Sequence, residues 1–316
     1  MGAAYSKLSQ TFQIIHTFTS THLIYAPRIT FDTSPYFFRH AYAIKVTFSK
    51  GGAEKMAGVI RTDKWLLHDD NQPLQIAKRL KKYFPNAEAE DVLHHLTMFG
   101  MSRSAVTKKQ IQKMQGANTW KIVAKDYQQL QYDWEGANIP IFILPSDTAN
   151  HKLRKEFNGK AGLSFNDKIF LFLSEWNTKM EIRALLTHEY NHVCRLTKYN
   201  KPESKYTLLD TIILEGMAEY AVYKRLGAEH TASYIGKYSD DVLHRFWNKY
   251  IAPKKELEPE SKTYYHLLYG SHLYPKMLGY CVGECLVRTY ANKHELSLKE
   301  LFTIESEQIA ETDILD

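Results

Sequence analysis

The sequence predicts a mostly helical α+β fold with one small β-sheet directly before a long, buried helix. Three observations support this fold class. Apolar residues recur at helical spacing from about 62 to 132, the pattern then changes to short β-branched and aromatic runs, and helical spacing returns for the rest of the chain. The chain has 316 residues, enough for one large or two modest domains, and no run approaches the ~18 apolar residues of a membrane span.

Four helices are predicted before the sheet, separated by turn residues such as Pro85 and Gly100. They are expected at 72–84, 89–101, 104–114 and 120–132.

The sheet is predicted from two short apolar runs, at 139–144 and 168–173, which are rich in β-branched and aromatic residues. Asn166 and Asp167 mark a turn before the second run, so we expect residues 162–165 to pair across it.

The C-terminal third, from about residue 228, is again predicted to be helical, with a polar loop at 253–259. A helix is expected from Pro275 to Tyr290, with the proline in its first turn. Gly279 and Gly283 lie four residues apart on this helix and would allow a close contact with a neighbouring helix.

The strongest motif is His188-Glu-Tyr-Asn-His192, inside the predicted buried helix 181–196. Residues four apart share a helical face, so the two histidines direct their imidazoles to one point, a spacing that suits two ligands of a tetrahedral zinc ion. Glu189 is placed to take a proton from a zinc-bound water and to deliver it to a leaving amine. The composition predicts about 0.04 chance occurrences of this pattern. The alternative is a solvated helix with accidental histidines, against which the apolar flanking residues argue.

Two carboxylates follow on the next predicted helix, at 206–227. Glu215 and Glu219 lie four apart on one face of an apolar run, and burying two carboxylates is costly unless positive charge faces them. We expect Glu215 to be the third zinc ligand and Glu219 to accept a hydrogen bond that fixes the tautomer of a ligand histidine. The alternative is that one of them caps a neighbour or pairs with Lys224 or Arg225.

Gly216, next to Glu215, is expected to let this helix approach the histidine-bearing helix closely.

Together the two motifs resemble the gluzincin class of metallopeptidases, of which thermolysin is a familiar member. The longer stretches His188-Glu-Tyr-Asn-His-Val-Cys-Arg195 and Ile213-Leu-Glu-Gly-Met-Ala-Glu-Tyr220 resemble more narrowly the bacterial YjaZ-type predicted zinc proteases, over roughly residues 56–316. The resemblance implies a zincin-like fold, one zinc ion and peptide hydrolysis. One difference is that 22 residues separate His192 from Glu215, slightly more than in thermolysin-like chains, so the linking loop is expected to differ.

In zincins the strand before the metal-binding helix commonly forms the upper rim of the cleft, and the resemblance implies the same here. We expect 168–174 to be this strand, as an exposed sheet edge whose backbone groups hold an extended peptide across the zinc. The alternative is an ordinary covered core strand. A donor for the oxyanion is expected from beyond the ligands, with Tyr280 as the first candidate and Tyr274 and His272 next. Packing in the core is the alternative for each.

The charge and cysteine content narrow the functional class. The net charge is +6, but residues 1–55 hold six Lys/Arg against two Asp/Glu, so the remainder is nearly neutral and lacks the continuous basic surface of a nucleic-acid-binding protein. Three cysteines are too few and oddly numbered for a disulfide framework, which favours a reducing cytoplasm. Cys281 and Cys285 are interpreted as core residues rather than as a second metal site.

The predicted protein is therefore a cytoplasmic zinc metallopeptidase that acts on a peptide or protein substrate, with no membrane span. It comprises an N-terminal extension at 1–55, which is an accessory segment or resembles a transit peptide, a helical region at 56–135 and a zincin-like catalytic region at 136–316. Two other functions stay open: a non-catalytic zinc-binding regulatory or interaction protein, and a zinc hydrolase with a non-peptide substrate. Glu189 favours catalysis, as does Cys194, which lies ~200° around the helix from His192 and is a poor fourth ligand.

Overall fold

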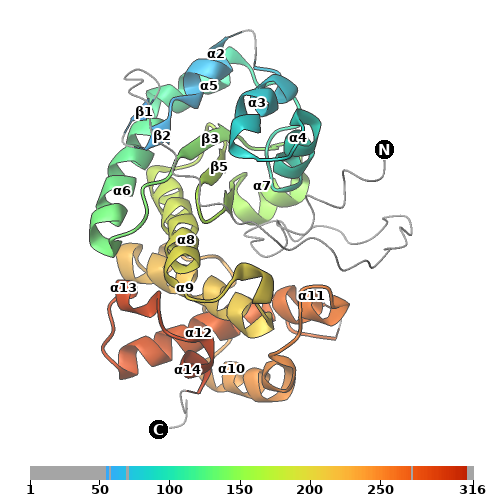
Figure 1. Ribbon diagram of the computed structural model, residues 1–316, viewed down its shortest axis with the longest axis vertical. Helices are drawn as coiled ribbons and strands as arrows, with labels where there is room; N and C mark the ends of the chain where they lie inside the picture. The colour runs from blue at the N-terminus through green and yellow to red at the C-terminus, as the bar shows by residue number, and fades with distance from the viewer. Residues whose placement is uncertain (1–54, 57, 69–70, 272, 312–316) are drawn as a thin grey trace.

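A five-stranded mixed sheet and the long helix that follows it organise the first half of the computed structural model (Figure 1). The structure describes residues 55–56, 58–68, 71–271 and 273–311, so the N-terminal extension lies almost entirely outside the described residues. The sheet has the order β1-β2-β3-β5-β4. Its strands are β1 (Lys55–Met56), β2 (Val59–Ile60), β3 (Ile141–Pro145), β4 (Ala161–Ser164) and β5 (Ile169–Leu173).

The position of β5 corrects the predicted sheet edge. β5 pairs in parallel with β3 on one side and antiparallel with β4 on the other, and all five of its residues are buried. The prediction that 168–174 forms the edge is therefore wrong, because the hairpin turn folds β4 onto the outer side of β5. Among the described residues, β4 is the last strand on this side of the sheet.

The helices that accompany this sheet confirm the mostly helical α+β class. They are α2 (Thr62–Leu67), α3 (Pro73–Leu80), the short 3-10 helix η1 (Lys81–Tyr83), α4 (Ala89–Met98), α5 (Lys108–Gly116), α6 (Thr119–Trp134) and α7 (His151–Phe157). Four of them, α3 with η1, α4, α5 and α6, lie close to the predicted ranges, whereas α2 and α7 were not predicted. One buried core joins them to β2–β5 and to the long helix that follows. This core contains residues on both sides of 135–136, and the division into regions 56–135 and 136–316 stays a prediction.

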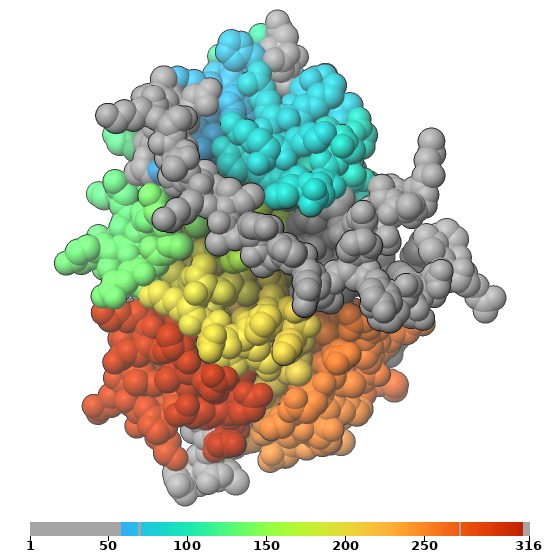
Figure 2. Space-filling model, in the orientation of Figure 1, coloured from blue at the N-terminus to red at the C-terminus, as the bar shows by residue number. Residues whose placement is uncertain are grey.

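Two long antiparallel helices form the middle of the molecule. α8 (Lys179–Lys198) begins with a capping box between Thr178 and Glu181, and α9 (Leu208–Leu226) follows the 3-10 helix η2 (Glu203–Lys205). α9 ends at Gly227, whose φ of 101° lies in the region that glycine adopts most easily. On the face shown in Figure 2, the yellow surface of this part of the chain separates the first half from the C-terminal helices.

The C-terminal helices pack around a second buried core below α9 (Figure 1). They are η3 (Ala228–His230), α10 (Asp240–Phe246), the π-helix η4 (Trp247–Ile251), η5 (Ala252–Lys254), α11 (Lys262–Tyr269), α12 (Leu278–Lys293), α13 (Leu298–Leu301) and α14 (Ser306–Ala310). α12 begins at Leu278, not at the predicted Pro275, because Met277 has a φ of 57° and donates its N–H to the carbonyl of Tyr269.

Glycines allow α9 and α12 to pack with their backbones in contact. A Cβ on Gly283 would lie 2.0 Å from the carbonyl oxygen of Ile212, and a Cβ on Gly216 would lie 2.2 Å from the carbonyl carbon of Gly283. The close contact predicted for Gly283 is therefore present. Gly216 was expected to serve the contact between α8 and α9, but it faces α12 instead.

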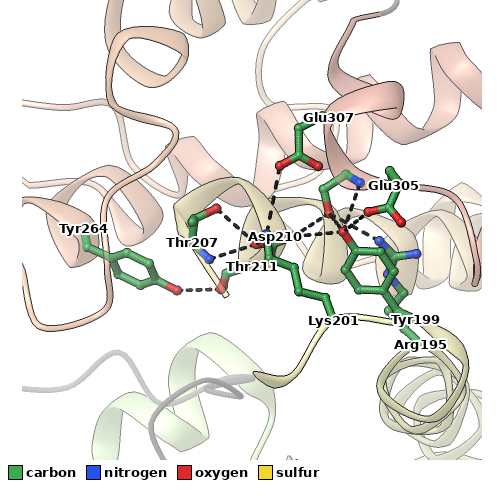
Figure 3. Close-up of polar contacts among 10 residues, drawn as sticks. Arg195, Tyr199, Lys201, Thr207, Asp210, Thr211, Tyr264, Glu305 and Glu307 are labelled. Atoms are coloured by element: carbon green, nitrogen blue, oxygen red, sulfur yellow. Dashed lines mark hydrogen bonds and ion pairs between the residues drawn. The ribbon is translucent and has the colours of Figure 1, made fainter. Parts of the chain in front are cut away.

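A buried polar network fastens the C-terminal segment to α8 and α9 (Figure 3). The carboxylate of Asp210, in the first turn of α9, accepts hydrogen bonds from Ser306 Oγ at 2.8 Å, Lys201 Nζ at 2.6 Å and the Thr207 N–H at 2.9 Å. The buried guanidinium of Arg195, on the last turn of α8, donates to three backbone carbonyls of the segment, those of Leu301, Phe302 and Ile304. These contacts attach the C-terminal segment to the last turn of α8 and to the first turn of α9.

The described residues include no helix both long and apolar enough to cross a membrane. All three cysteines are free and buried. Cys281 and Cys285 lie in the second core, as predicted for core residues.

Candidate metal centre

Two histidines lie on the face of α8 that is turned toward α9. His188 and His192 are buried to within 2% of full exclusion from solvent, and their ring centroids are 4.6 Å apart with the rings nearly perpendicular. The four-residue spacing in a regular helix produces this arrangement, because one turn brings the second ring next to the first.

Glu215 on α9 faces both histidines. Its Oε2 lies 3.4 Å from His188 Nε2 and 3.6 Å from His192 Nε2. One ligating atom from each of the three residues lies within 4.8 Å of the others, and the three side chains are buried. Two imidazoles and one carboxylate are a donor set typical of a catalytic zinc site, which keeps its fourth position open.

The hydrogen bonding of these residues supports a cation at their centre. In the described part of the chain, neither ring nitrogen of His192 and neither carboxylate oxygen of Glu215 has a hydrogen-bond partner. Buried polar groups nearly always have a partner, and a metal ion coordinated by one ring nitrogen of His192 and by the Glu215 carboxylate would supply one to each residue. The residues present therefore fit one zinc ion.

The electrostatics of the cluster also favour positive charge. Burial lowers the pKa of His188, but the nearby carboxylates of Glu215 and Glu219 outweigh this effect and raise the pKa to about 10. Burial raises the pKa of Glu215, but the neighbouring His192 and His188 lower it to about 2. The cluster thus holds the carboxylate of Glu215 ionised in a buried site, as cation binding requires.

Glu219 lies beside the first histidine, on the side away from Glu215. Its Oε1 lies 3.1 Å from His188 Nδ1, and its Oε2 accepts the N–H of Ala232 at 2.9 Å. A proton on Nδ1 that is donated to Glu219 leaves Nε2 of His188 facing Glu215 with its lone pair available. The alternative partner Arg225 lies elsewhere, since it pairs with Asp126 at 3.3 Å and donates to Thr187.

Glu189 turns from the histidine face of α8 toward the edge strand β4. Its carboxylate accepts a hydrogen bond from Ser164 Oγ, which lies 2.9 Å from the backbone carbonyl of the same glutamate. Gly162, two residues earlier in β4, leaves room for this carboxylate, because a Cβ there would lie 2.2 Å from Glu189 Oε1. The sequence analysis missed Ser164 and Gly162 as site residues. A glycine inside a predicted strand was the available signal, since it often marks a close approach.

The three oxyanion candidates have different positions. Tyr280 is buried on the first turn of α12, and the pKa of its hydroxyl is raised well above the usual value by burial and by Glu215. The hydroxyl of Tyr274 accepts a hydrogen bond from Lys254 at 3.1 Å and its ring packs on Tyr250, and no described contact joins it to the histidines or Glu215. His272 lies outside the described residues.

Two further tyrosines, which the sequence analysis did not identify, accompany Tyr280. The ring centroid of Tyr234 is 5.5 Å from that of Tyr280, and its hydroxyl donates a long hydrogen bond of 3.5 Å to Glu219. Tyr269 is 5.8 Å from Tyr280 between ring centroids, and their hydroxyls are hydrogen-bonded. Burial raises the pKa of both Tyr234 and Tyr269, with nearby glutamates adding to it, so all three keep their protons.

Comparisons with known proteins agree with these features. The model of the family described as "Predicted Zn-dependent protease (DUF2268)" matches residues 119–311, which extend from α6 to α14. A relative from Bacillus subtilis (strain 168), described as "Uncharacterized protein YjaZ", is 39% identical over 228 residues, which cover 71% of this chain and 87% of the relative. No solved structure matches.

Proposed function

Because the chain belongs to the DUF2268 family of predicted Zn-dependent proteases, as its YjaZ-type motifs predicted, we propose that it is a metallopeptidase of the gluzincin type that hydrolyses peptide bonds. The convergence of His188, His192 and Glu215 carries this proposal, together with Glu189, which follows His188 directly in the same helix. A single zinc ion held by the first three residues supplies Lewis acidity, which polarises a carbonyl and lowers the pKa of water.

Glu189 is the general base and acid. Its carboxylate accepts the proton of the attacking water and later passes that proton to the leaving amine. Ser164 holds one oxygen of this carboxylate from β4, so the base has a fixed direction before the substrate arrives. Without this hydrogen bond, the carboxylate would have to be oriented again in each catalytic cycle.

The edge strand β4 is the proposed substrate platform, in place of the 168–174 strand that the sequence predicted. Among the described residues, no strand pairs with its outer side, so its N–H and C=O groups can bind an extended peptide. Ser164 and Gly162 place this strand directly against Glu189, which brings a peptide bound there close to the base.

Tyr280 is the proposed donor to the oxyanion that forms during attack. A donor must keep its proton, and burial together with Glu215 raises the pKa of this hydroxyl well above its usual value.

We place the enzyme in the cytoplasm, since its three cysteines are free and buried, as in proteins of reducing compartments.

The substrate class is tested by incubating the zinc-loaded full chain with a random peptide library, a set of simple esters and a set of non-peptide amides. Hydrolysis of peptides at internal bonds, identified by mass spectrometry and absent in Glu189→Gln, is the expected result. Turnover of esters or other amides without any peptide cleavage would show that the protein is a zinc hydrolase with a non-peptide substrate. Zinc binding without turnover of any of the three sets would support the non-catalytic alternative.

A further inference from the structure

A pocket opens beside the candidate metal centre, between α7 and the C-terminal helices. Lys152 and Phe157 line it from α7, and Tyr234, Tyr269 and Tyr280 line it from the opposite side. It combines an aromatic wall with charged groups, which is the usual composition of a pocket that selects one kind of side chain or end group.

The tyrosine wall connects this pocket to the metal centre. Tyr234 donates to Glu219, the residue that orients His188, and the ring of Tyr280 packs against that of Tyr234. Burial and then Glu215 raise the pKa of Tyr280, which places its hydroxyl within electrostatic reach of the third candidate ligand. A substrate that reaches the centre can therefore place one of its groups in the pocket.

The charges at the pocket do not balance. Lys152 and Lys276 both line it, but Glu156 is the one carboxylate among its described lining residues. Glu156 Oε2 lies 3.8 Å from Lys276 Nζ, and none of the ion pairs of the described residues involves Lys152. Burial lowers the pKa of Lys152; Glu156 opposes this effect and Lys276 adds to it, with a net lowering. The Lys152 ammonium thus lacks a full counter-charge.

We propose that this pocket binds a carboxylate-bearing group of the substrate, with Lys152 and Lys276 as its cationic partners and the aromatic wall as its apolar lining. The inference rests on the proposed peptidase function and assigns its substrate class as peptides that present a carboxylate to this pocket. The carboxylate comes from an Asp or Glu side chain or from the free C-terminus of the substrate, and both present the same group to two ammonium ions.

Binding to the zinc-loaded, full-length Glu189→Gln variant tests the pocket apart from hydrolysis. The probes are fluorescent hexapeptides that differ only in Glu against Gln at one scanned position, or in a free against an amidated C-terminus. We expect the carboxylate-bearing member of at least one pair to bind about tenfold more tightly. A side-chain pair that differs identifies an acidic residue, and a C-terminal pair that differs identifies the chain end. Equal binding within every pair would overturn the proposal.

Charge variants in the same background identify the pocket residues. Lys152→Ala and Lys276→Ala should each reduce the preference, Glu156→Gln should increase it, and Lys152→Glu should reverse it in favour of peptides with Lys at that position. Lys155→Ala is the matched control, because this lysine is exposed on the same helix and does not line the pocket. A preference that Lys152→Glu leaves unchanged would overturn the assignment.

Failure of this inference and failure of the proposed function give different results. Peptide cleavage by the wild type without any carboxylate preference would contradict the role of the pocket but not the peptidase function. A carboxylate preference in binding, with no peptide cleaved by the wild type, would support the role of the pocket and contradict the peptidase function.

Discussion

The hydroxyl of Ser164 donates a hydrogen bond to the carboxylate of Glu189, and this contact joins the edge strand of the sheet to the helix that carries both histidines. Ser164 also lies 2.9 Å from the backbone carbonyl of Glu189, so the strand is fixed to the helix at the position of the general base. The proposed substrate platform and the proposed base are therefore one structural unit, and changes in either should affect turnover.

Ser164→Ala should lower kcat by about 10- to 100-fold, because a hydrogen bond to a charged group contributes about 1.5–3 kcal/mol. KM and zinc content should stay unchanged, since Ser164 contacts none of the three candidate ligands in the described hydrogen bonds. Steady-state kinetics on a cleaved peptide measure the effect. Ser164→Thr should recover part of the loss, and the alanine change should have no further effect in a Glu189→Gln background. If a change in folding alone caused the loss of kcat, the Tm of Ser164→Ala would also be lower.

Gly162→Ala should reduce kcat by about 100-fold and also lower Tm. The new methyl would lie 2.2 Å from Oε1 and 2.5 Å from Cγ of the buried Glu189, so the whole glutamate side chain must move away. Gly116→Ala is the control, since a Cβ there meets no atom within 4 Å. Full activity in Gly162→Ala would show that the carboxylate position seen here is not the one used in catalysis.

Glu219→Gln should weaken zinc binding by about 10- to 100-fold, because it replaces the charged acceptor of the His188 Nδ1 proton. Competition with a metal chelator measures the affinity. Glu229→Gln, an exposed change just beyond α9, should leave it unaltered. An unchanged affinity in Glu219→Gln would separate Glu219 from metal binding.

Asp210→Ala should lower the free energy of unfolding by about 3 kcal/mol, because it removes a buried carboxylate that accepts hydrogen bonds from Ser306 and from the Thr207 N–H, and it leaves Lys201 without its close partner (Figure 3). Urea denaturation measures this loss. Glu307→Ala is the matched control, since Glu307 approaches Lys201 only to 4.0 Å and is half-exposed, and it should change stability by less than about 1 kcal/mol. Similar values for the two variants would contradict the central role of Asp210 in the network.

Local sequence patterns were sufficient for much of the fold. The helical spacing of apolar residues and the capping residues Thr178 and Gly227 lie where α8 begins and α9 ends. The motif spacings also predict that His188, His192 and Glu215 lie together. The two histidines are one helical turn apart on α8, and Glu215 lies on the buried face of the next helix. Their roles as ligands stay predictions until metal is measured.

These local patterns do not predict which strands pair or which distant residues come into contact. The periodicity of residues 169–173 identifies a strand but not its neighbours, and β4 takes the edge through a hairpin that closes on the outer side. The continuous apolar run of β5 was a signal for a central strand, since strands covered on both faces lack polar alternation. Tyr234 lies in an irregular segment between η3 and α10, outside both motifs, so only tertiary packing brings it to Glu219.

Zinc content and peptide hydrolysis of the wild type and of Glu189→Gln, measured on the same preparations, test the proposed mechanism most directly. We expect one zinc ion per chain in both proteins and cleavage of a random peptide library by the wild type alone, because Glu189 moves the proton and holds no metal. Cleavage by Glu189→Gln at the wild-type rate, or the absence of zinc from both proteins, would contradict it.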